Sequence, residues 1–133
     1  YFAKEKGVCE AMAAGLAEGV KFALLNPQET IELLFKDLPE LKLASTAKEQ
    51  LEIGMGVWAA NYMTKEAMEK GVGYSDPAIY KTMTDLIFET SGAAGDKKPD
   101  PNTLFTNEFV GKLKLTDAEW AKVKAGTAKY ALG

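Results

Sequence analysis

The sequence predicts one mainly α-helical unit of five or six helices spanning residues 1–133. Apolar side chains recur at helical spacing in several long stretches, and a residue type that commonly caps helices precedes most of them. Strand-like alternation is confined to residues 41–43 and 113–115, which are too short to establish a sheet. With 133 residues, 47% of them hydrophobic and 26% charged, the composition is that of one folded domain.

The first two helices are expected on either side of Asn26. The first covers residues 2–25, and its expected inward face consists of Val8, Met12, Gly15, Leu16, Gly19 and Ala23. Asn26 is the expected N-cap of the second helix, with Pro27 at its first position and Glu29 three residues after the cap. Pro39 ends this helix. Its expected inward residues are Ile31, Leu34, Phe35 and Leu38.

A third, long helix is expected from Thr46 to about Lys70. Thr46 and Glu49 have the spacing of a capping box, in which each side chain bonds a free backbone amide of the same turn. Gly54 and Gly56 weaken this helix and indicate close packing or a bend. Its expected inward residues are Leu51, Met55, Trp58 and Tyr62.

Two further helices are expected in the second half of the chain. Asp76 and Pro77 begin one that runs to about Thr90, with Ile79, Met83, Leu86 and Ile87 inward. A surface loop over residues 91–102 and a short element over 105–109 follow. Thr116 and Glu119 form another capping box. The expected inward residues of the helix that they open are Trp120, Val123, Thr127 and Tyr130.

The composition argues against catalysis by these residues alone. The chain has no His, and its sixteen basic residues are all Lys. It therefore lacks the usual general base near neutral pH and the planar guanidinium that captures anions in a bidentate manner. Cys9 is its one cysteine, so neither a zinc site nor an internal disulfide is expected. We expect no enzyme activity, no cofactor and no metal. The net charge of −3 and the pI of about 5.1 argue against nucleic-acid binding.

Five segments, in order, carry a resemblance to a known family. They are residues 19–23, 26–29, 73–77, 100–101 and 105–109, the last reading Phe-Thr-Asn-Glu-Phe. This order resembles the C-terminal region of substrate-binding proteins of ABC transporters, of the nitrate/taurine/sulfonate and thiamine-pyrimidine-precursor type. The resemblance extends to about Val110, and the tail from 111 to 133 departs from it, so we expect only a packing helix there. The residues that carry the motif are Asn26, Pro27, Asp76, Phe105, Thr106, Asn107, Glu108 and Phe109.

The resemblance implies a two-lobed α/β fold of the type II periplasmic-binding-protein class, of which this chain is the C-terminal helical part. It also implies a periplasmic or extracellular protein, with or without a membrane anchor, that captures a small solute and delivers it to an ABC permease. The strands and most cleft residues would then precede Tyr1. No matched residue is carried over as a ligand contact, and Tyr74 is the one loop aromatic that we consider for the cleft edge. Asn107 and Glu108 are expected to fix backbone, with Phe105 and Phe109 as anchors.

Two alternatives remain open. One is a segment of a thiamine-pyrimidine synthase of the same superfamily, and the other is an autonomous helical interaction module. Helices that evolved to cover a sheet expose apolar faces when the sheet is absent. We therefore expect the 133-residue chain to form a homodimer or a domain-swapped assembly. The solute itself is not specified by these residues.

Overall fold

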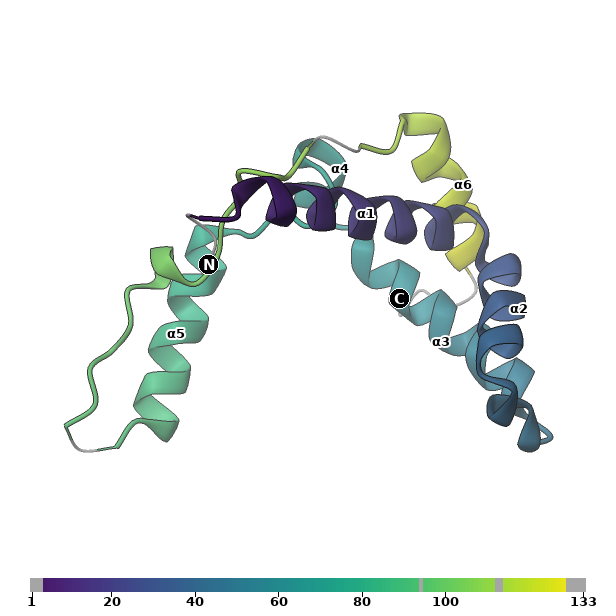
Figure 1. Cartoon of the computed structure of the whole chain (residues 1–133), viewed down its shortest axis with the longest axis horizontal. Coiled ribbons are helices and arrows are strands. Elements are labelled where there is room, and N and C mark those ends of the chain that lie inside the picture. Colours follow the sequence, from purple (N-terminus) through teal and green to yellow (C-terminus); the bar gives the residue numbers. More distant parts are fainter. Residues whose placement is uncertain (1–3, 94, 112–113, 129–133) are drawn as a thin grey trace.

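A computed structural model describes residues 4–93, 95–111 and 114–128, and this part of the chain contains helices and loops but no strand. Its six α-helices and two short 3₁₀ helices form an arch (Figure 1). Helix α1 lies across the top, α5 descends on one side, and α2 and α3 descend on the other. The predicted mainly α-helical fold is confirmed. The elements are α1 (Lys6–Leu25), α2 (Pro27–Asp37), η1 (Pro39–Leu43), α3 (Ala47–Tyr62), α4 (Lys65–Lys70), α5 (Pro77–Ser91), η2 (Pro101–Thr103) and α6 (Asp117–Thr127).

The single long helix expected from Thr46 to Lys70 is in fact two helices. Helix α3 ends at Tyr62, and α4 begins at Lys65. The break occurs because Thr64 adopts an extended backbone, and its hydroxyl accepts a hydrogen bond from the Ala67 N–H at 3.1 Å. Threonine competes in this way with the helical backbone for hydrogen bonds, which favours a cap over a helix interior.

The core lies where α1, α3 and α6 meet. Partly buried side chains pack around this core. Among them are Trp58 and Tyr62, whose ring centroids are 4.8 Å apart. These two side chains therefore pack into the protein. The fully buried members of this core cluster are Leu24, Ala59, Leu115, Trp120 and Val123. Trp120 and Val123 were expected inward, as was Thr127, which is also buried. The expected inward residue Tyr130 lies outside the described residues.

Two of the four expected N-caps form and two do not. The Asp76 carboxylate accepts from the Ala78 N–H at 2.7 Å, and Thr116 and Glu119 complete a capping box. Thr46 makes no capping bond, and the Asn26 amide instead donates to the Phe22 carbonyl, at the end of α1. The backbone explains the difference, because an N-cap needs an extended conformation, which Asp76 and Thr116 have and the other two lack.

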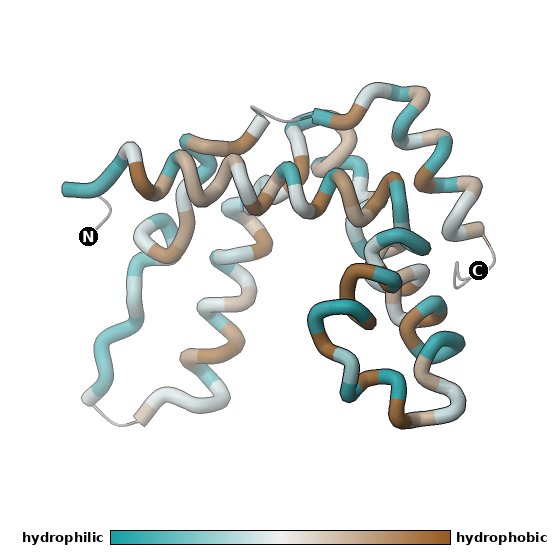
Figure 2. The backbone as a smooth tube through the Cα atoms, turned by 45° about the vertical axis from the view of Figure 1, so that its right-hand side comes forward, coloured by the Kyte–Doolittle hydropathy of each residue, from teal (hydrophilic) through white to brown (hydrophobic). Residues whose placement is uncertain are grey.

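Two expected inward faces are exposed in the structure. On α1, Leu16 is 70% exposed and the core contact is made further along, by Leu24. On α5, Leu86 is 59% exposed, and apolar segments recur along both helices (Figure 2). Helical periodicity identifies an apolar stripe but does not say whether a neighbour covers it. The exposed residues of the two stripes are Val8, Met12, Leu16, Ile79, Met83, Leu86 and Ile87; Leu38, expected inward on α2, is also exposed.

Helix α5 packs by a different face from the expected one. Its buried residue is Thr84, and the Tyr80 ring lies 4.6 Å, centroid to centroid, from the ring of Phe105. Among the described elements, its main packing partner is η2. The arm formed by α5, residues 92–93 and residues 95–104 is therefore thin, with one side packed and the other side open.

The caps give a paired stability test. Thr116→Ala removes the hydroxyl that accepts the Glu119 N–H and should lower the free energy of unfolding by about 1 kcal/mol. Thr46→Ala, at the start of α3, removes no capping bond and should change the free energy of unfolding by less than about 0.5 kcal/mol. Urea unfolding of both variants measures the difference. Equal losses of unfolding free energy in the two variants would contradict the assignment of Thr116 as a cap and of Thr46 as a residue without one.

Candidate functional site

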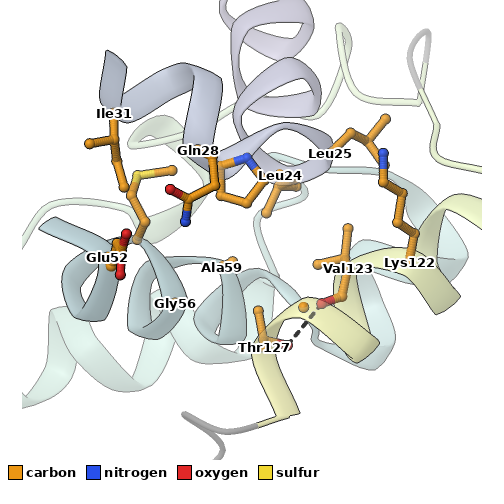
Figure 3. Close-up of a pocket in the computed structure, with 13 residues that line it drawn as sticks. Leu24, Leu25, Gln28, Ile31, Glu52, Gly56, Ala59, Lys122, Val123 and Thr127 are labelled. Atoms are coloured by element: carbon orange, nitrogen blue, oxygen red, sulfur yellow. Dashed lines mark hydrogen bonds between the residues drawn. The ribbon is translucent and has the colours of Figure 1, made fainter. Parts of the chain in front are cut away.

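The candidate site is a cavity of about 220 Å³ where the turn between α1 and α2 faces α3 and α6 (Figure 3). Four separate helices contribute to it, so it exists only in the folded chain. Its lining residues are Leu24, Leu25, Pro27, Gln28, Ile31, Glu52, Met55, Gly56, Ala59, Lys122, Val123, Gly126 and Thr127.

Small residues leave this space open. Gly56 and Ala59 form the α3 wall, and Gly126 lies on the α6 side. A methyl group added at Gly126 would meet no atom within 4 Å. Ile31 on α2 and Val123 on α6 complete the walls and are two of the most completely buried side chains in the described structure, at 1% and 2% exposed. These walls are therefore withdrawn from solvent.

The polar groups around the cavity differ in what they already bind. The Thr127 hydroxyl donates to the Val123 carbonyl at 3.0 Å, as a dashed line marks in Figure 3, so its proton is engaged. The Glu52 carboxylate lies 4.0 Å from the Lys48 ammonium. The side chains of Gln28 and Lys122 have no polar partner among the described residues. Gln28, in the first turn of α2, therefore offers a free amide to whatever enters.

This arrangement is suited to binding. No hydroxyl or thiol of the cavity faces a base that would make it a nucleophile. Within residues 4–93, 95–111 and 114–128, no cluster of three metal-ligating side chains is found. What the cavity offers is an apolar surface with a few polar groups, the usual makeup of a small-molecule pocket.

An ion pair fixes the α6 side of the cavity. The Glu119 carboxylate accepts the Thr116 N–H at 2.7 Å and pairs with the Lys21 ammonium of α1 at 2.9 Å. The Thr116 backbone hydrogen bond, and then Lys21, hold the pKa of Glu119 below its ordinary value of 4.5. The pair ties the first turn of α6 to α1 and so holds Val123 against Leu24.

Most motif residues that carry the resemblance lie away from this cavity; the exceptions are Asn26 and Pro27 at the turn between α1 and α2, of which Pro27 lines it. Asn107 joins two distant segments: its Oδ1 accepts the Ser75 N–H at 2.9 Å and its Nδ2 donates to the Ser75 carbonyl at 2.8 Å. Thr106 accepts the Glu108 N–H through its hydroxyl, and the Glu108 carboxylate pairs with the Lys6 ammonium. Residues 105–109 therefore lie beside the start of α5 and the start of α1. Phe109 is half-buried.

Two glycines allow the backbones to meet beside this segment. Gly71 is buried with φ +112°, and a methyl group on it would lie 3.0 Å from the Gly111 Cα. Gly111 has φ +87°. Side chains other than glycine are strained at such φ values, so both positions require glycine. The end of α4 thereby packs directly against the residues that follow Phe109.

Tyr74 lies in the loop before α5 and does not line the cavity. Its hydroxyl accepts a hydrogen bond from the Lys70 ammonium at 3.0 Å, and the same nitrogen lies 4.2 Å from the ring centroid. The hydrogen bond to Tyr74 is the main reason that the pKa of Lys70 is raised. The ring is half-buried, and one of its faces is already occupied by a cation.

Sequence reasoning did not identify the cavity residues as a site. Gln28, Glu52 and Lys122 lie far apart in the chain; Gln28 lies in the motif segment 26–29, but no ligand contact was expected from that segment. Only the junction of α2, α3 and α6 brings them together. The one local signal was Gly56, which was expected to mark close packing or a bend.

Comparison of the chain with protein-family models, with curated proteins and with solved structures finds no match. Among the described helices, none combines the length and apolar character needed to cross a membrane.

Acid should weaken the contact between α1 and α6. Because the pKa of Glu119 is lowered in the folded protein, its contribution is present above the unfolded value of about 4.5 and is lost as the pH falls through the folded value. Glu119→Gln should therefore lower the stability more at pH 7 than at pH 3. Urea unfolding at both pH values measures this, with Glu89→Gln, an exposed carboxylate on α5, as the control. An equal loss at both pH values would contradict the role of this carboxylate.

Proposed function

We propose that this chain is the helical C-terminal portion of a substrate-binding protein for ABC import, of the nitrate/taurine/sulfonate and thiamine-pyrimidine-precursor type. The observation that carries the proposal is the pair of uncovered apolar stripes on α1 and α5. A helix with an apolar stripe must bury it against another layer of structure. In the two-lobed α/β fold that the resemblance implies, the sheet of a lobe is that layer.

The contacts of Asn107 support the same proposal. The Phe-Thr-Asn-Glu-Phe segment and the Gly-Tyr-Ser-Asp-Pro turn are separated by about thirty residues of sequence, yet Asn107 bonds both backbone groups of Ser75. The two strongest pieces of the resemblance therefore belong to one structural unit. A coincidental pair of short matches gives no reason for such a contact.

In this proposal the described helices are scaffold. The solute binds in a cleft between the lobes, and closure of the lobes over it produces the form that a permease recognises. The residues that contact the solute belong to the rest of the protein, and the protein acts in the periplasm or outside the cell. Its role is capture and delivery, with no chemical change to the solute.

The coding sequence upstream of Tyr1 tests this function. We expect an open reading frame with a signal peptide followed by alternating strand and helix patterns. The protein encoded by that frame should then gain thermal stability with one member of a panel of nitrate, taurine, alkanesulfonates and pyrimidines. A start codon directly before Tyr1 would overturn the proposal in favour of an autonomous helical module. Turnover of a bound pyrimidine would overturn it in favour of the synthase.

The open stripe on α5 also predicts self-association of the 133-residue chain. Without a covering layer, two copies should bury Ile79, Met83, Leu86 and Ile87 against each other. Sedimentation velocity at micromolar concentrations should show a dimer, and Leu86→Glu should weaken dimerisation at least tenfold. Ala78→Glu, an exposed position on the same helix whose i+3 and i+4 neighbours lie outside the stripe, is the control. A monomer at all of these concentrations would contradict the prediction.

A further inference from the structure

The cavity between α2, α3 and α6 is larger than ordinary packing leaves. Protein interiors are close-packed, and most of their voids are no larger than a water molecule. This one has a volume of about 220 Å³ and opens to solvent beside Gln28, Lys122 and Gly126, which are exposed. A dry engineered cavity of roughly 150 Å³ already accommodates benzene, so a single aromatic ring fits here with room for a substituent.

The chemistry of the walls selects an uncharged occupant. Leu24, Ile31, Val123 and Ala59 present carbon to the space, and all four are buried. A charged group that reached these walls would lose its hydration without meeting a buried counterion, because Lys122 is exposed at the rim of the cavity and Glu52 lies 4.0 Å from the Lys48 ammonium. The Thr127 hydroxyl is bonded to the Val123 carbonyl, so it has no proton left to give.

Among the uncharged polar side chains that line the cavity, Gln28 remains for recognition. Gln28 is exposed and its side chain borders the cavity between α2 and α3, as Figure 3 shows, and its amide has no hydrogen-bond partner among the described residues. An amide both donates and accepts, so it can pair with a hydroxyl or with a ring nitrogen of an entering molecule.

From the volume, the apolar walls and the free amide, we propose that this cavity is a binding site for a small uncharged aromatic molecule that carries one hydrogen-bonding group. The ring lies between Ile31, Val123 and Ala59, and the polar substituent bonds the Gln28 amide. This inference goes beyond the proposed function and is independent of it, because it rests only on residues of the described helices.

Phenol and benzene are the probes, since they differ only by a hydroxyl group. Titration of each into the isotope-labelled chain should shift the methyl NMR signals of Leu24, Ile31 and Val123 in a saturable manner. Gln28→Leu should weaken the binding of phenol about threefold to tenfold and leave the binding of benzene unchanged, because only phenol can form a hydrogen bond with the amide. An equal effect on both probes would overturn the assignment of Gln28, and the absence of saturable shifts would overturn the site.

Filling the cavity supplies the second test. Ala59→Leu places three further carbons in the cavity and should weaken the binding of both probes at least tenfold. Ala125→Leu, an exposed position on α6 that does not line the cavity, should leave binding unchanged. If Ala59→Leu does not fold, Gly126→Leu replaces it, because a side chain there meets no atom within 4 Å at its Cβ. Unchanged binding in the filled variant would overturn the proposal.

Discussion

The packing of α6 against α1 and α3 is the contact on which the rest of this structure depends. Trp120 and Val123 are buried there with Leu24 and Ala59, although nearly one hundred residues separate Leu24 from Trp120. Complete burial of an apolar side chain of this size contributes about 1.5–3 kcal/mol. The indole N–H of Trp120 has no hydrogen-bond partner among the described residues, and such a buried group costs about 1–3 kcal/mol. The ring is retained for its volume.

The two sides of the arch are held by different forces. The side with α2, α3 and α6 has a continuous apolar core, whereas α5 is fixed by polar contacts at its base and by packing against η2. Asn107 forms hydrogen bonds with both backbone groups of Ser75. Asp85 of α5 pairs with Lys81 of the same helix and with Lys98 of the following loop. These last pairs are exposed, and exposed ion pairs contribute little. The α5 side therefore has the lower local stability and the larger uncovered apolar surface.

These two sides account for the two proposals. The uncovered stripes of α1 and α5 require another layer of protein, which supports a scaffold role within a larger binding protein. The cavity beside the core has the opposite character, since it is small, is bordered by four helices and has buried apolar walls. It suits a small molecule and has no need of a further lobe.

The sequence by itself determined the helices, because helical spacing and local chain breaks such as Asn26–Pro27 and Asp76–Pro77 act within a few residues. It also determined the capping box of Thr116 and Glu119, which needs only one turn of helix. The Thr64 cap that separates α3 from α4 is equally local, although the spacing of apolar residues did not reveal it. Only the tertiary structure decided which stripes are covered and that Gln28 faces Gly56 and Val123 across a cavity. These depend on contacts between residues far apart in the chain, and periodicity along one helix contains no information about its neighbours.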